Sequence, residues 1–251
     1  MQTRFSKPSD TNDSNWWTDA RDALDNQLLF DCMVQQNPGR SESGMFPDNM
    51  WKYALREDWP PLYATARGWD LASTKGGGDW TVGARIGRAP NGDVYIMGRE
   101  REQLSSHDGI ERVKAMANAD GAHVPIVIEE EKGGGKNLVE FYRRELPGYS
   151  VIGSPVTGTK EQRATPYSTL QQGGHVWLPS DDADAEWVAS WVKEHSGMMG
   201  DGRRPRHDDQ IDAASHSVNY LLDHGLVEIM DPNDMRENTY QMLEYLEAMG
   251  L

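Results

Sequence analysis

Residues 67–83 read RGWDLASTKGGGDWTVG, and this stretch decides how we interpret the rest of the chain. Its pattern is that of a β-strand that carries Asp70, followed by a glycine-rich turn and a second strand. A carboxylate on a central strand costs free energy unless a partner pairs with it. Metal ions are common partners of such carboxylates, so we take Asp70 as a candidate metal ligand and look for other acids that could join it.

The composition narrows the class of protein. The 251 residues include 40 acidic and 25 basic side chains, which gives a formal net charge of -15. This charge argues against a protein that coats nucleic acid electrostatically, but not against an enzyme that grips it locally. The single cysteine, Cys32, permits no internal disulfide. Because no run approaches the ~20 apolar residues of a membrane span, and no signal peptide is visible at the start, we expect a soluble protein with no membrane partner.

The order of the predicted elements indicates an α/β fold. Strands are expected at 64–72, 80–88 and 94–101, and Asn91-Gly92 is typical of a hairpin turn between the last two. Further strands at 124–128, 149–152 and 174–178 alternate with helices at 108–119, 136–146, 160–172, 183–195 and 207–224. Antiparallel strands followed by alternating helices and strands predict a mixed β-sheet with helices on both faces. The ribonuclease-H-like fold has this order.

Less regular segments flank this core, which we place at residues 60–225. Residues 1–59 are rich in aromatic side chains but are interrupted by proline and glycine. They predict an arm, with one helix near 18–35, that packs on the core or links to it. The alternative is a segment that docks on a partner protein. Residues 226–251 are expected to form an acidic helical tail.

Acidic side chains occur at three places in the predicted core. Asp70 lies on the first strand, Glu129 follows the apolar run VPIVI, and Asp208, Asp209 and Asp212 begin the last helix. Each group alone has an ordinary explanation, since acids also favour turns, strand ends and helix N-termini. Oxygen ligands from separate elements, however, select magnesium or manganese over zinc. Two such ions about 4 Å apart can assist the hydrolysis of a phosphodiester, so the set favours a metal-dependent nuclease.

The spacing does not choose among the acids of the last helix. Asp209 and Asp212 are three positions apart, and Asp208 and Asp212 are four apart. Either pair can therefore share one side of a helix. The principal ligand remains open at this point.

Four stretches together resemble the nuclease domain of the large terminase subunit of tailed bacteriophages. They are RGWDLASTKGGGDWTVG (67–83), VPIVIEEEKGGGKNL (124–138), GSPVTGTKEQRATPYSTLQQGGHVWLP (153–179) and RHDDQIDAASHSVNYLL (206–222). The resemblance covers about residues 60–225. It implies a ribonuclease-H-like endonuclease that cuts concatemeric viral DNA during genome packaging, by hydrolysis with two Mg²⁺ or Mn²⁺ ions. The implied partners are double-stranded DNA, a packaging ATPase, the small terminase subunit and the portal. The implied location is the host cell cytoplasm, and the protein would be absent from the mature virion.

The resemblance also assigns roles to particular residues. The catalytic acids of the family match Asp70, Glu129 and Asp209, with Asp212 and Asp208 as supporting metal ligands and Asp79 as a secondary acid. A basic pair that faces DNA in the family matches Lys160 and Arg163. Other basic residues lie near the acidic motifs in sequence and are candidates for contacts to phosphates, which position DNA without reading its bases; they are Lys132, Lys136, Arg203, Arg204 and Arg206.

One departure from the family concerns its packaging ATPase. That motor needs a glycine-rich phosphate loop that ends in Gly-Lys-Ser/Thr. The nearest string, GSPVTGTKE at 153–161, places its lysine one position late and follows it with Glu161. We therefore expect a nuclease without an ATPase motor. Two alternatives remain: another ribonuclease-H-like nuclease of the junction-resolvase or integrase type, and a non-catalytic docking module of a packaging motor.

Overall fold

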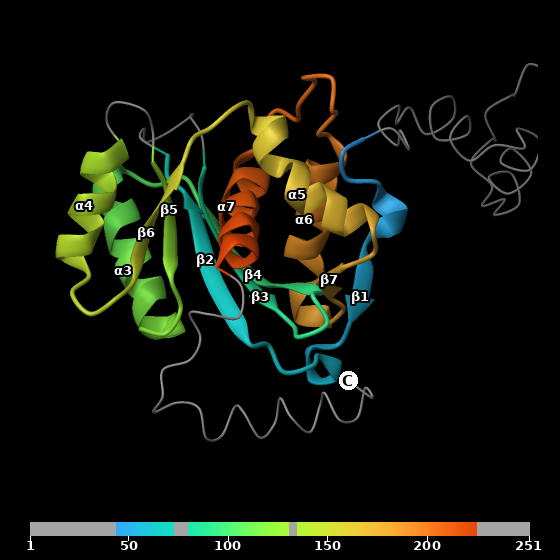
Figure 1. Cartoon of the computed structure of the whole chain (residues 1–251), viewed down its shortest axis with the longest axis horizontal. Coiled ribbons are helices and arrows are strands. Elements are labelled where there is room, and N and C mark those ends of the chain that lie inside the picture. The colour runs from blue at the N-terminus through green and yellow to red at the C-terminus, as the bar shows by residue number, and fades with distance from the viewer. Residues whose placement is uncertain (1–43, 73–79, 131–134, 225–251) are drawn as a thin grey trace, which may run out of the picture. The chain divides into compact units, whose positions relative to one another are not determined.

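Figure 1 shows the computed structural model of the chain, which describes residues 44–72, 80–130 and 135–224. All of them belong to the second of the two units into which the chain divides, Gly44–Leu251. The helix expected near 18–35 and the helical tail expected at 226–251 lie outside the described residues. Within the described part of the chain, no helix is long and apolar enough to cross a bilayer.

A mixed β-sheet forms the centre of the described unit. Its strand order is β1-β7-β4-β3-β2-β5-β6. The strands are β1 Lys52–Ala54, β2 Ala64–Asp70, β3 Thr81–Arg88, β4 Val94–Glu102, β5 Ile126–Glu130, β6 Val151–Pro155 and β7 Val176–Pro179. Strand β3 is antiparallel to both of its neighbours, whereas the other neighbouring pairs are parallel.

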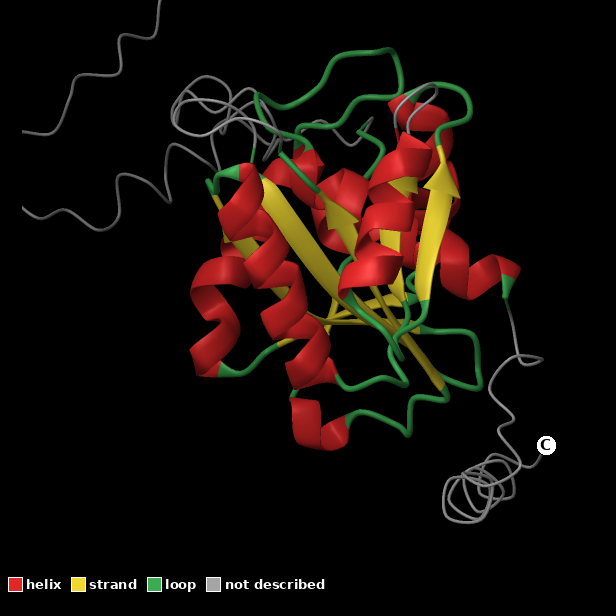
Figure 2. Ribbon diagram, turned by 90° about the vertical axis from the view of Figure 1, so that its left-hand side faces the viewer, coloured by secondary structure: helices red, strands yellow, loops and turns green. Residues whose placement is uncertain are grey.

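Helices cover both faces of this sheet, which confirms the predicted architecture (Figures 1 and 2). On one face lie α3 Ser106–Asp120 and α4 Gly135–Glu145, and on the other lie α5 Lys160–Gln172, α6 Ala185–Ser196 and α7 Asp209–Asp223. Three short 3-10 helices complete the described elements: η1 Asp48–Met50, η2 Arg56–Asp58 and η3 Asp182–Asp184.

The two faces of strand β2 contribute to two separate cores. Trp69 packs with residues of α3 and α4, whereas Ala66 packs with residues of α5, α6 and α7. Because successive side chains of a strand point to opposite faces, Gly68 and Asp70 lie on the same face as Ala66. The strand therefore directs Asp70 towards α7.

Several strand bounds differ from the sequence-based expectation: β6 and β7 each begin two residues later than expected, and β5 and β1 differ for reasons that can be named. Strand β5 continues through Glu129 and Glu130, because these residues pair with Ser154 and Pro155 of β6. The prediction relied on the run of apolar residues, so it ended this strand at residue 128, before the two acids. Strand β1 was not predicted, because three residues between proline-rich turns carry little periodic signal; it pairs in parallel with β7.

The segment that precedes β1 joins the core of the sheet. Phe46 and Trp51 are 1% and 4% exposed, and their rings lie against Tyr167 of α5 and His195 of α6. Met45 donates a backbone hydrogen bond to the carbonyl oxygen of Met198, at 2.8 Å. Aromatic packing thus ties residues 45–51 to the helices on the α7 side of the sheet.

Helix α7 approaches the sheet closely at Gly68. A Cβ atom there would lie 2.2 Å from the carbonyl oxygen of Ala213 and 2.8 Å from the amide nitrogen of Ser217. The Gly68 amide donates a hydrogen bond to Ser217 Oγ at 2.5 Å, and Ser217 Oγ donates to the carbonyl oxygen of Ala84 at 2.9 Å. Only glycine permits this contact, which fixes where α7 rests on β2 and β3.

We expect Gly68→Ala to lower the free energy of unfolding by about 3 kcal/mol, the upper part of the usual range for overpacking. The methyl group meets backbone atoms, which cannot rotate away. The measurement is urea denaturation.

The matched control is Gly98→Ala on β4, where no heavy atom lies within 4 Å of the added Cβ. We expect this control to change stability by less than about 0.5 kcal/mol. Equal effects of the two substitutions would contradict a close-packed α7.

Candidate metal centre

Acidic side chains from three elements meet at one end of the sheet. The last paired residues of β2 and β5 are Trp69 and Ile128, so Asp70 and Glu129 follow as adjacent residues on neighbouring strands. Both point to the face that α7 covers. Asp209 and Asp212 occupy the first turn of α7 and are 5% and 4% exposed.

The electrostatics show that these acids lie close enough to repel one another. Burial raises the pKa of Asp70 well above its ordinary value, and the negative charges of Asp212 and Asp209 raise it further. Lys160 acts in the opposite direction, and Glu129 adds a further upward shift. Burial likewise raises the pKa of Asp212, against the opposing charge of Lys160. Concentrated carboxylates of this kind are stabilised by a cation.

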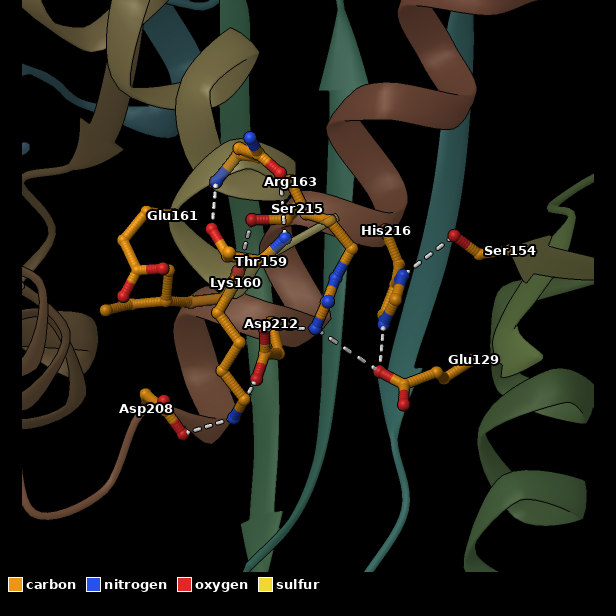
Figure 3. Close-up of polar contacts among 12 residues, drawn as sticks. Glu129, Ser154, Thr159, Lys160, Glu161, Arg163, Asp208, Asp212, Ser215 and His216 are labelled. Carbon is orange, nitrogen blue, oxygen red and sulfur yellow. Dashed lines mark hydrogen bonds and ion pairs between the residues drawn. The ribbon is translucent and has the colours of Figure 1, made fainter. Parts of the chain in front are cut away.

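Two basic side chains of α5 lie among the acids (Figure 3). Lys160 Nζ is 2.7 Å from Asp208 Oδ1 and 2.5 Å from Asp212 Oδ2. Arg163 Nη2 is 3.5 Å from Asp212 Oδ1 and 3.8 Å from Glu129 Oε2. Burial lowers the pKa of Lys160, but the charges of Asp212 and Asp208 outweigh this effect and raise it overall.

A capping box holds the first turn of α5 in place. The side chain of Thr159 accepts a hydrogen bond from the Gln162 amide at 3.3 Å, and Gln162 Oε1 accepts one from the Thr159 amide at 2.9 Å. Gly158, with a φ of 74°, adopts the left-handed conformation just before this turn. This local geometry places Lys160 and Arg163, three positions apart, on the side of α5 that faces the acids.

The donor set fits a hard divalent cation, since it consists of carboxylate oxygens from separate, rigid elements. In the arrangement observed, no three acidic or histidine side chains of the described residues converge as metal ligands. The cationic groups of Lys160 and Arg163 lie between them instead. The chemistry of the residues therefore suits Mg²⁺ or Mn²⁺, while their present partners are basic side chains.

His216, which was not among the residues predicted from the sequence, contacts one of the acids. His216 is 2% exposed, and its Nε2 lies 3.3 Å from Glu129 Oε2. Its Nδ1 is 2.8 Å from Ser154 Oγ on β6. The nearby imidazole of His216 lowers the pKa of Glu129, against the effect of burial. The available signal was its position one helical turn after Asp212, on the same side of α7.

A buried acid of α6 fixes the start of α7. Glu194 accepts hydrogen bonds from the backbone amide of Gln210 at 2.7 Å and from its Nε2 at 2.6 Å. Arg101 Nη2 lies 3.6 Å from Glu194 Oε2. Burial raises the pKa of Glu194 to about 7, although the hydrogen bonds from Gln210 oppose the shift. Glu194 thus anchors the helical turn that carries Asp209 and Asp212.

The remaining candidates fall into two groups. The loop before α7 carries three exposed arginines: Arg203 pairs with Asp201 at 2.8 Å, Arg204 pairs with Glu161 at 2.6 Å, and Arg206 is exposed beside them. Asp79 and Lys132 lie outside the described residues. Lys136 is in the first turn of α4, but its side chain is likewise not described. The structure therefore gathers Asp70, Glu129, Asp208, Asp209, Asp212, Lys160 and Arg163 into one cluster.

Comparison with known proteins gives a family and a fold. The family model described as Terminase RNaseH-like domain matches residues 67–221. The crystal structure of the large terminase nuclease from thermophilic phage G20c matches 70% of this chain and 98% of its own, with a TM-score of 0.51 and 19% identity. The structure of that nuclease with bound magnesium matches 71% and 98%, with a TM-score of 0.52 and 18% identity. No curated protein matches the chain significantly. The ribonuclease-H-like fold expected from the sequence is confirmed.

We expect His216→Leu to weaken binding of Mn²⁺ by roughly 10- to 100-fold, as is usual when the partner of a metal-ligating side chain is removed. Without the imidazole, Glu129 loses the contact that orients it. Isothermal titration calorimetry measures the affinity, and Ser154→Ala should weaken it in the same direction by less.

A purely structural His216 would behave differently. In that case His216→Leu would lower the free energy of unfolding and leave the Mn²⁺ affinity unchanged.

The raised pKa of Glu194 predicts a pH dependence of stability. Since the pKa rises on folding from 4.5 to about 7, protonated Glu194 favours the folded state at low pH. This contribution is lost as the pH rises through about 7. Between pH 5 and pH 8 the native protein should lose roughly 2 kcal/mol relative to Glu194→Gln. Urea denaturation of both proteins at the two pH values tests this, and parallel pH profiles would refute it.

Proposed function

The chain belongs to the family of terminase RNaseH-like domains, and from this premise we propose that it is a metal-dependent endonuclease that cuts concatemeric viral DNA during genome packaging. One observation carries the proposal: Asp70, Glu129 and Asp212 come from β2, β5 and α7 and gather at one end of the sheet, close enough that, besides burial, the charges of Asp212 and Glu129 raise the pKa of Asp70. A fold has no stability reason to concentrate like charges in this way, so a functional reason is the better explanation.

The acids have distinct tasks in this proposal. Asp70 and the α7 acids, Asp209 and Asp212, hold the ions, and Glu129 completes the ligand set in the orientation that His216 gives it. When bound, two Mg²⁺ or Mn²⁺ ions would supply an activated water and would stabilise the leaving 3′ oxygen of the phosphodiester. The partly exposed Asp208 supports the site from the start of α7.

Basic side chains around the acids suit a DNA substrate. Lys160 and Arg163 lie beside the carboxylates, and the loop with Arg203, Arg204 and Arg206 leads into α7. Such residues position a duplex through its phosphates. Because the whole chain carries a formal charge of -15, binding depends on this local concentration of positive charge.

The setting we propose follows from the family. The nuclease acts on double-stranded DNA in the host cell cytoplasm, in concert with a packaging ATPase, the small terminase subunit and the portal. Residues 67–221, which match the family model, supply the nuclease part in this proposal.

We expect the purified protein to cleave supercoiled plasmid in Mg²⁺ or Mn²⁺ and not in EDTA. Asp70→Asn should reduce the rate by more than about 100-fold, because even the partners of metal ligands are worth 10- to 100-fold. A gel assay of plasmid cleavage measures both effects.

The control is Glu140→Gln, which removes an exposed carboxylate on α4, away from the acids. It should retain full activity. Cleavage by Asp70→Asn at the rate of the native protein would overturn the proposal.

A further inference from the structure

Lys160 lies where a cation would be expected to lie among the acids of α7. Its ammonium nitrogen is 2.7 Å from Asp208 Oδ1 and 2.5 Å from Asp212 Oδ2, so one positive group pairs with two carboxylates (Figure 3). The Asp212 side chain is 5% exposed and its other oxygen faces Arg163 at 3.5 Å. Each oxygen of Asp212 therefore already has a cationic partner.

The Lys160 side chain can also move away from the two carboxylates. It is 32% exposed, compared with 11% for that of Arg163. Lys160 lies in the first turn of α5, which its own capping box keeps intact without help from the ammonium group. Lysine side chains rotate readily about four carbon–carbon bonds, so the ammonium group can move into solvent while α5 stays in place.

We propose that Lys160 is a built-in counter-ion, which occupies the cation position between Asp208 and Asp212 until a divalent ion displaces it. This inference rests on the metal site of the proposed function and deepens it. It also explains why the described acids do not converge as metal ligands in the arrangement observed. The lysine keeps the acids neutralised and the fold stable when no metal is bound, and it opposes metal binding to the same extent.

Displacement has a consequence for DNA. An ammonium group that pairs with two carboxylates is unavailable to a phosphate, whereas a released one, still near the site, can bind the DNA backbone. Metal binding and DNA binding then strengthen each other, because linkage between two sites is reciprocal. The exchange would make the basic side chain available only where a metal is already present.

Calorimetric titration of Mn²⁺ into the intact protein in the absence of DNA tests the exchange. Lys160→Met should bind Mn²⁺ at least roughly tenfold more tightly than the native protein, since no ammonium has to be displaced. In EDTA the same variant should melt at a lower temperature, and Mn²⁺ should raise its melting temperature by more than it raises that of the native protein.

Arg204→Gln is the matched control. Arg204 is near enough for the charges of Asp208 and Asp212 to affect its pKa, but its guanidinium pairs with Glu161. If the loss of any nearby positive charge were the cause, both variants should bind Mn²⁺ more tightly by a similar factor. If displacement of Lys160 is the cause, Arg204→Gln should change the affinity for Mn²⁺ by less than about threefold. Equal effects would overturn the inference.

A second measurement on the native protein covers the case in which Lys160→Met does not fold in EDTA. Acetylation of amines, followed by mass spectrometry, should label Lys160 slowly without metal and several-fold faster with Mn²⁺. The exposed Lys193 serves as the internal reference, with a constant rate. An unchanged Lys160 rate in a protein that binds Mn²⁺ would refute displacement but leave the metal site standing. A native protein that does not bind Mn²⁺ at all would refute the metal site itself.

Discussion

The close approach of α7 to β2 is the constraint on which the rest of the structure depends. Gly68 allows it, since any side chain there would collide with the backbone of α7, 2.2 Å away at Ala213. Ser217 then connects the helix to both β2 and β3 by hydrogen bonds. The first turn of α7 is thereby brought over the ends of β2 and β5. Without this contact, the acids of α7 would not lie beside those of β2 and β5.

Bringing these acids together opposes folding, and the surroundings offset much of that cost. Lys160 and Arg163 neutralise Asp212 and Asp208, while His216 and Arg163 face Glu129. Glu194 adds a further buried carboxylate in order to hold the first turn of α7. Stability is thus traded for the geometry of one site, as is common where function needs a particular arrangement of charge. The basic residues have two tasks: they stabilise the acids and lie where a nucleic acid backbone would pass.

The order of the elements could be predicted from the strand and helix patterns of the sequence. Asp70 and Glu129 could be grouped because each lies on or directly after a predicted strand of the core. Periodicity did not distinguish the acids of α7, because the first turn of a helix tolerates acids on any side. In the structure these acids differ in burial: the side chains of Asp209 and Asp212 are 7% and 5% exposed, while that of Asp208 is 18% exposed. Strand β1 was too short to carry a pattern.

Contacts between distant parts of the chain were the hardest to foresee. His216 and its partner Ser154 are 62 positions apart, and neither is an acid. The ion pair of Lys160 with Asp208 spans 48 positions. Sequence resemblance placed Lys160 beside DNA, but only the structure shows that its ammonium group is already paired with the acids.

The most direct measurement is a crystal structure of the protein grown with Mn²⁺, with anomalous scattering used to locate the ions. We expect anomalous peaks bounded by Asp70, Glu129 and the acids of α7, with the Lys160 side chain moved away from Asp212. Two results would contradict a metal centre at this end of the sheet. One is manganese bound elsewhere on the protein, and the other is a crystal grown in Mn²⁺ that shows no anomalous peak among the acids and keeps Lys160 between Asp208 and Asp212.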